Sequence, residues 1–147
     1  MTIHNLYMFD ASGNCILYRE WHREKHPNMS KDEEFKLMYG MLHSLRSFAD
    51  KLACVDGKQR FRCYETNAYA LHSFETPTGV RIVVNTDTDA AGMEELLRQV
   101  YAQVYVECLV KNPLVKDPRS SGQITSELFL SRLDALVQGH SSFAAAS

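Results

Sequence analysis

The fold is decided by the stretch Ile3-His-Asn-Leu-Tyr-Met-Phe9, then Asp10-Ala-Ser-Gly-Asn14, then Cys15-Ile-Leu-Tyr-Arg-Glu-Trp21. The five-residue turn between the two strand-like runs offers a glycine for a positive-φ position. Residues 6–9 are apolar at consecutive positions, which favours a strand buried on both faces. The second run alternates between two faces, which is typical of a strand nearer an edge. We therefore place the first strand in the middle of a sheet whose other strands are added later, on its far side.

Three further strands are predicted at residues 61–66, 69–76 and 80–86. Short turns separate them, and Pro77-Thr-Gly79 suits the second turn because proline favours its first central position and glycine a left-handed one. The last run is rich in β-branched residues and apolar at consecutive positions, so it should be central. We expect it to pair with the first strand, which gives a five-stranded antiparallel sheet of order 2-1-5-4-3.

A first helix is predicted from Ser30 to about Ala53. Ser30 and Glu33 form a capping box at its start. An apolar stripe covers nearly half of its circumference, wide enough to lie flat on a sheet. The stripe consists of Phe35, Leu37, Met38, Met41, Leu42, Leu45, Phe48, Ala49 and Leu52.

Two more helices are predicted at about 91–111 and 123–137. The C-terminal half of the first of them is apolar nearly all round, and one sheet face cannot cover such a helix. A second helix or a partner must therefore cover it, at Ala102, Tyr105, Val106 and Leu109. One helix on one sheet face and two on the other make an α+β, three-layer sandwich.

The outer side of the first helix is a candidate docking surface. Its residues are Lys36, Tyr39, Gly40, His43, Ser44, Ser47 and Lys51. A mid-helix glycine costs about 1 kcal/mol relative to alanine, and Gly40 lies with Ser44 and Ser47 at i, i+4 and i+7. Small residues in a row let a neighbouring backbone approach closely, so we interpret this side as a groove for a partner. The alternative is an ordinary solvent-facing helix.

Length and composition indicate one domain, which we place at residues 1–140 with a flexible tail at 141–147. The net charge of −2 gives no attraction to nucleic acid or to an anionic membrane. The four cysteines are scattered without a C-x-x-C pair, so we expect free thiols in a cytosolic protein. No signal peptide or membrane-spanning run is recognisable, and we expect any membrane contact to be indirect.

Motifs that carry chemistry are weak. His22 and His26 have zinc-ligand spacing, but Arg23 stands where a zinc protease needs glutamate, and Pro27 follows at once. The sequence has no G-x-S-x-G and no glycine-rich phosphate loop. The cations and the aromatic residue at 58–62 are common at a strand end. We therefore predict a protein that is not an enzyme, with no catalytic residue, metal, cofactor or nucleic-acid partner.

Five separated stretches, in the right order, resemble the longin, or SNARE-like, fold and within it the smallest, sedlin-related longin-type subunits of TRAPP tethering complexes. They are NLYMFDASGNCILYREWH (5–22), EFKLMYGMLHSLRSF (34–48), ETPTGVRIVVNTD (75–87), YVECLVKNPL (105–114) and SELFLSRLD (126–134). The chain departs from the pattern at 115–122, which is longer and more polar, and in its tail.

The resemblance implies a scaffold and docking subunit in ER-to-Golgi vesicle transport. It implies other TRAPP subunits as partners, a paralogous longin-type subunit among them, in a complex that releases GDP from a Rab GTPase. The expected location is cytoplasmic and peripheral to endoplasmic reticulum and Golgi membranes.

Two alternatives stay open from the sequence. One is the small chain of a clathrin-type adaptor, which shares the fold and the N-terminal hairpin. The other is a small ligand-sensing or enzymatic α+β domain. A pull-down with mass spectrometry separates tethering subunits, adaptor chains and no partner.

Overall fold

The computed structural model describes residues 3–22, 28–56, 62–110 and 127–140, without the side chains of 107–110. The strands are β1 (Ile3–Phe9), β2 (Cys15–Glu20), β3 (Cys63–Glu65), β4 (Ala70–Glu75) and β5 (Arg81–Thr86). The helices are α1 (Lys31–Leu52), α2 (Met93–Gln99), its continuation η1 (Val100–Val110) and α4 (Glu127–Gln138). The strands form one antiparallel sheet of order β2-β1-β5-β4-β3, which confirms the predicted order.

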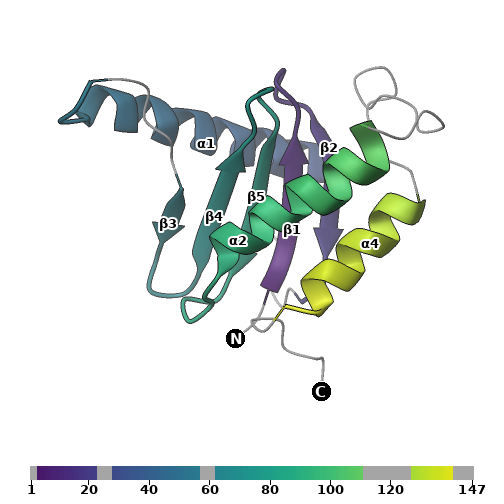
Figure 1. The fold of residues 1–147 in the computed structure, drawn as a ribbon. Helices are drawn as coiled ribbons and strands as arrows, with labels where there is room; N and C mark the ends of the chain where they lie inside the picture. Colours follow the sequence, from purple (N-terminus) through teal and green to yellow (C-terminus); the bar gives the residue numbers. More distant parts are fainter. Residues whose placement is uncertain (1–2, 23–27, 57–61, 111–126, 141–147) are drawn as a thin grey trace.

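Helices cover both faces of the sheet. Figure 1 shows α1 behind the sheet, and α2 and α4 in front of it. The predicted α+β three-layer sandwich is therefore confirmed. Both central strands are buried on both faces because each contributes to both layers of the core.

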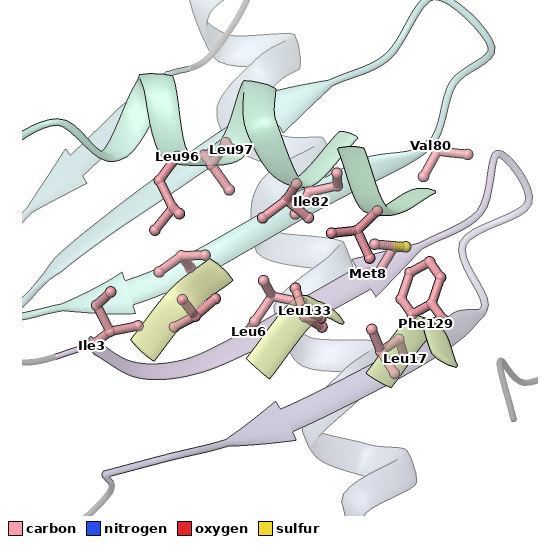
Figure 2. Packing of buried hydrophobic residues seen from close by; sticks show 14 of the residues in the cluster. Ile3, Leu6, Met8, Leu17, Val80, Ile82, Leu96, Leu97, Phe129 and Leu133 are labelled. Atoms are coloured by element: carbon pink, nitrogen blue, oxygen red, sulfur yellow. The ribbon is translucent and has the colours of Figure 1, made fainter. Parts of the chain in front are cut away.

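The core is divided by the sheet into two clusters. On the α2 side, strand residues such as Leu6, Met8 and Ile82 pack against Leu97 of α2 and Leu133 of α4, as Figure 2 shows. The α1 side holds a smaller cluster, whose buried members are Tyr7, Phe9, Leu42, Leu71 and Val83. In the larger cluster, α4 packs together with the apolar helix that starts near residue 91, so α4 is the second helix that the sequence predicted would help to cover it.

The start of α1 is tied to the sheet by polar contacts. The Ser30 hydroxyl accepts a hydrogen bond from the backbone N–H of Glu33 at 3.3 Å, as the capping-box pattern predicts. Inside the first turn, buried Glu34 accepts a 2.6 Å hydrogen bond from the Tyr7 hydroxyl and lies 3.2 Å from the Lys31 ammonium. A buried carboxylate needs such partners, so they fix where α1 begins on the sheet.

The predicted sheet-facing stripe of α1 is wrong at three positions. Leu37, Phe48 and Leu52 have 62%, 62% and 64% of their surface exposed. A helix of 22 residues is about 33 Å long, whereas five strands span about 19 Å. Figure 1 accordingly shows the C-terminal turns of α1, the end of the helix that holds Phe48 and Leu52, extending past β3. Leu37, near the start of the helix, is exposed because it lies about 140° around the helix from buried Leu42.

Two other elements differ from the predicted ones. Strand β3 covers only Cys63–Glu65, where 61–66 was expected, and all three residues are exposed. The second helix begins at Met93 and continues as a π-helix over Val100–Val110. In η1 the Tyr101 and Tyr105 rings lie 5.8 Å apart, nearly parallel at 22°. The last helix is described over Glu127–Gln138, and the predicted start at 123 lies outside the described residues.

The turn between β1 and β2 has the glycine that the sequence indicates. Gly13 has φ +92°, and its N–H donates to the carbonyl of Asp10 at 3.1 Å. The Asp10 carboxylate accepts from the backbone N–H of Ser12 and of Asn14, each at 2.9 Å. These bonds hold the turn tightly, close above α1.

Helix α4 is fastened to β2 by one carboxylate. Asp134 accepts hydrogen bonds from the Arg19 guanidinium and, at 3.0 Å, from the Trp21 indole N–H. The side of α4 that carries Asp134 therefore faces β2, and the opposite side faces away from the sheet.

Candidate interaction surface

Most of the predicted docking residues on α1 lie on its solvent side. Six of them are exposed, namely Lys36, Gly40, His43, Ser44, Ser47 and Lys51. A Cβ atom built on Gly40 has no heavy atom within 4 Å. The backbone of α1 is thus open to close approach at Gly40.

Tyr39 has an internal role. It is half-buried, and its ring lies 5.6 Å from the Phe9 ring and 5.2 Å from the Arg81 guanidinium carbon. Its Cε1 atom is 2.8 Å from the position that a Cβ of Gly13 would take. The ring therefore supports the β1–β2 turn, and His43 stacks on it from the outside at 6.3 Å.

An exposed apolar strip runs beside these residues, formed by Leu37, Phe48, Leu52 and Val55. Val55, just beyond the end of α1, is 68% exposed. At 100° per residue, Leu37, Ser44 and Phe48 lie within about 40° of one another around the helix. The strip therefore adjoins the small residues Gly40 and Ser44. Large apolar side chains gathered on one surface are typical of an interaction site.

The predicted surface on the second helix is smaller than the sequence suggests. Ala102 is exposed, whereas Tyr105 and Val106 are half-buried. Tyr105 packs against the α2-side core, and the side chain of Leu109 lies outside the described residues. Helix α4, which lies beside η1 in Figure 1, buries Phe129 and Leu133 completely. Among the side chains that the structure describes, this region therefore offers a partner less apolar surface than α1 does.

The described residues hold no group of three or more His, Cys, Asp or Glu side chains suited to a metal ion. Residues 23–27, which include the predicted His26, lie outside them, and the ring Nδ1 of His4 is 2.8 Å from the His22 carbonyl oxygen. Burial lowers the pKa of His72 and raises that of Cys63. Neither shift favours an activated thiolate.

In the described part of the chain, no helix is long and apolar enough to span a membrane.

The thiols should differ in reactivity. Cys15, Cys54 and Cys63 are free thiols, and the side chain of Cys108 is not described. Burial raises the pKa of Cys15 to about 11, so only about one molecule in a thousand carries its thiolate at pH 8. We expect iodoacetamide to alkylate Cys15 much more slowly than exposed Cys54 at pH 8, and faster as the pH approaches 11. Mass spectrometry of timed samples measures this, and equal rates at the two sites, or a disulfide in native material, would contradict it.

Comparison with known proteins places the chain among trafficking-complex subunits. It is 47% identical over 145 residues to "Trafficking protein particle complex subunit 1" of Homo sapiens, covering 99% of this chain and 98% of that protein. The subunit of the same name in Dictyostelium discoideum is 31% identical over 143 residues, 96% of this chain and 98% of that protein. "Trafficking protein particle complex subunit 4" of Bos taurus is 34% identical over 101 residues, 69% of this chain and 45% of that protein.

These relatives are named as subunits and not as enzymes, which supports the prediction of a non-catalytic subunit. They also favour the tethering-complex interpretation over an adaptor small chain. The Sybindin-like family matches residues 3–140, nearly the whole of the predicted domain. On these grounds the chain belongs to the Sybindin-like family.

Proposed function

We propose that the chain is a scaffold subunit of a trafficking protein particle (TRAPP) complex and that the outer side of α1 docks a second longin-type subunit. The observation that carries this proposal is the exposed apolar strip beside the open backbone at Gly40. Near-full-length similarity to subunit 1 of such complexes supports the membership.

A paralogous subunit is the partner that best suits this surface. The bovine subunit 4 is 34% identical over 69% of this chain, so a related chain is present among the named subunits of such complexes. Two related chains can meet through similar surfaces around a pseudo-two-fold axis, as in isologous dimers. Gly40 and Ser44 would let the two helices approach, and Leu37 and Phe48 would be removed from water.

We extend the proposal to the function of the assembled complex. The complex would act as an exchange factor for a Rab GTPase in ER-to-Golgi transport, at the cytoplasmic surface of those membranes. The chain would contribute docking surface and no catalytic group. Its resemblance to TRAPP subunits and the trafficking names of its relatives support this extension.

A pair of substitutions at Gly40 tests the docking surface. We expect Gly40→Arg to weaken binding of the subunit-4-like paralogue at least about tenfold, because a long side chain holds the partner away from α1. The thermal midpoint of the subunit should change little, since the position is open. The control Gly40→Ala should keep binding and add about 1 kcal/mol of helix stability.

Binding is measured by titration calorimetry with the purified paralogue, and by the Rab exchange rate of the reconstituted complex. Normal binding and exchange by the arginine variant would show that Gly40 is not part of the interface. A pull-down that recovers adaptor large chains in place of tethering subunits would refute the complex assignment itself.

A further inference from the structure

A cavity of about 320 Å³ lies on the α2 side of the sheet, next to its β3 edge. Strands β3 and β4 form one wall and α2 the other, and Figure 1 shows that α2 leaves β3 uncovered. The residues used below are Arg62, Cys63, His72, Phe74, Glu94, Leu97 and Arg98. The docking surface on α1 lies on the opposite face of the sheet, so this cavity is a separate feature.

The rim of the cavity carries two guanidinium groups that share one carboxylate oxygen. Glu94 Oε1 lies 3.7 Å from Arg62 Nη1 and 3.4 Å from Arg98 Nη2. Good charge-assisted hydrogen bonds are about 2.7–2.9 Å long, so these two contacts are loose. The side chains of Arg62, Arg98 and Glu94 are 74%, 61% and 57% exposed, so the pairs contribute little to folding.

The residues that line the cavity therefore include two guanidinium groups for one rim carboxylate, and Glu65 of β3, which acts electrostatically on Cys63 and His72, lies near the cavity but outside its lining. Glu75, the other carboxylate of the lining, is held by Arg46 of α1 at 2.8 Å. Two guanidinium groups with one shared carboxylate leave donors for a second carboxylate. The ligand that complements the rim is an anion.

The inner surface is suited to an apolar group. Leu97 is buried and Phe74 is half-buried, with its ring 5.9 Å from that of Tyr101. His72 lies directly across the strand pair from Cys63, and its Nε2 is 3.1 Å from the Thr86 hydroxyl. Burial lowers the pKa of His72, so its ring is neutral at pH 7. The volume is at the small end of ligand pockets, about 300–1,000 Å³, and suits one large side chain.

We propose that this cavity docks a partner protein through one acidic residue that adjoins a large apolar residue. The apolar side chain enters between β4 and α2, and its neighbouring carboxylate binds Arg62 and Arg98. Glu94 holds the two arginines in the free chain and is displaced. The proposal rests on the proposed function only in assuming a multi-protein assembly, and it assigns a second contact on the other face.

If the ligand displaces Glu94, substitution of Glu94 and substitution of Arg98 should change the affinity for a probe in opposite directions. The probe is acetyl-aspartyl-phenylalanine amide, titrated into the 15N-labelled full chain and followed by amide shifts of Cys63, His72 and Arg98. We expect Glu94→Gln to bind it about threefold to fivefold more tightly, because the internal competitor is lost. Arg98→Gln should bind it more weakly by a similar factor, with Arg98→Lys in between. If the ion pair only supported the fold, both glutamine variants would change binding in the same direction.

Two further probes separate the parts of the ligand. Acetyl-asparaginyl-phenylalanine amide lacks the charge and should bind all variants equally weakly. Acetyl-aspartyl-alanine amide lacks the ring and should bind at least threefold more weakly than the first probe. With the wild-type chain, raising the salt from about 50 to 500 mM should weaken the acidic phenylalanine probe and leave the neutral one unchanged.

Absence of shifts at the cavity, equal affinity for the acidic and neutral probes, or the same sign for the two glutamine variants would overturn the proposal. The salt series decides even if a variant folds poorly, because it uses the unaltered chain. Binding of the subunit-4-like paralogue by α1 is measured separately. A negative result for the cavity therefore does not refute the docking surface on α1, and a negative result for α1 does not refute the cavity.

Discussion

Replacement of Phe48 by aspartate is expected to weaken binding of the partner subunit by about 100-fold or more while the subunit still folds. Phe48 is 62% exposed in the free chain, so the change removes little of the core and should alter the free energy of unfolding by less than about 1 kcal/mol. In a docked complex the same position would lose an aromatic anchor and leave a carboxylate without a partner. Each of these effects commonly costs about 2 kcal/mol or more at the centre of an interface.

Leu128→Asp is the matched control for this experiment. Leu128 is also a large exposed apolar residue, at 47%, but it lies on α4, across the sheet from α1. Leu128→Asp should leave the affinity for the paralogue unchanged, whereas Phe48→Asp should lower it. Calorimetric titration of each variant with the paralogue gives the two affinities. Full affinity of Phe48→Asp would show that the apolar strip is not the contact surface.

Substitution of Gly13 by alanine is expected to destabilise the subunit by about 3 kcal/mol and to lower its thermal midpoint by about 6–12 °C. Two causes add. The φ of +92° is strained for any residue with a Cβ, and that Cβ would lie 2.8 Å from the Tyr39 ring. The ring cannot simply rotate away, because Phe9 and Arg81 pack against it.

Gly40, at an open position, provides the comparison. Gly40 has no atom within 4 Å of a built Cβ and stands inside a regular helix, so Gly40→Ala should stabilise where Gly13→Ala destabilises. Chemical denaturation of both variants measures the difference in the free energy of unfolding. A further variant, Gly13→Ala with Tyr39→Leu, should recover the part of the loss that comes from the ring. A loss below about 1 kcal/mol for Gly13→Ala would mean that the turn adjusts freely.

The sheet could be predicted from the sequence because its two central strands carry their own signal. Residues 6–9 and 82–84 are apolar at consecutive positions, which only a strand covered on both faces requires. With both placed in the centre, the order of the remaining strands followed. The cap at Ser30 and the turn glycine at Gly13 could also be predicted, because each depends only on residues close to it in the chain.

The candidate site could be predicted only in part. The exposed side of α1 followed from helical periodicity, but periodicity does not show how far a sheet extends beneath a helix. Phe48 and Leu52 therefore seemed to face the core, and they lie past it. Tyr39 was placed on the docking surface because no pattern shows that the β1–β2 turn rests on its ring. The cavity depends on Arg62 meeting Glu94 across a sheet edge, a contact between segments far apart in the sequence.

The position of β1 has a consequence for how the protein is made. This strand leaves the ribosome before the other strands of the sheet, yet one of its two neighbours is β5, which is complete only at Thr86. The helix that Asp134 fastens to Arg19 and Trp21 emerges later still, more than 110 residues after them. Contacts this distant in sequence make folding slow and leave apolar strands uncovered meanwhile. A nascent chain that stops before α4 therefore lacks Phe129 and Leu133, which complete the larger core cluster over β1 and β2, and chaperones would meet it in that state.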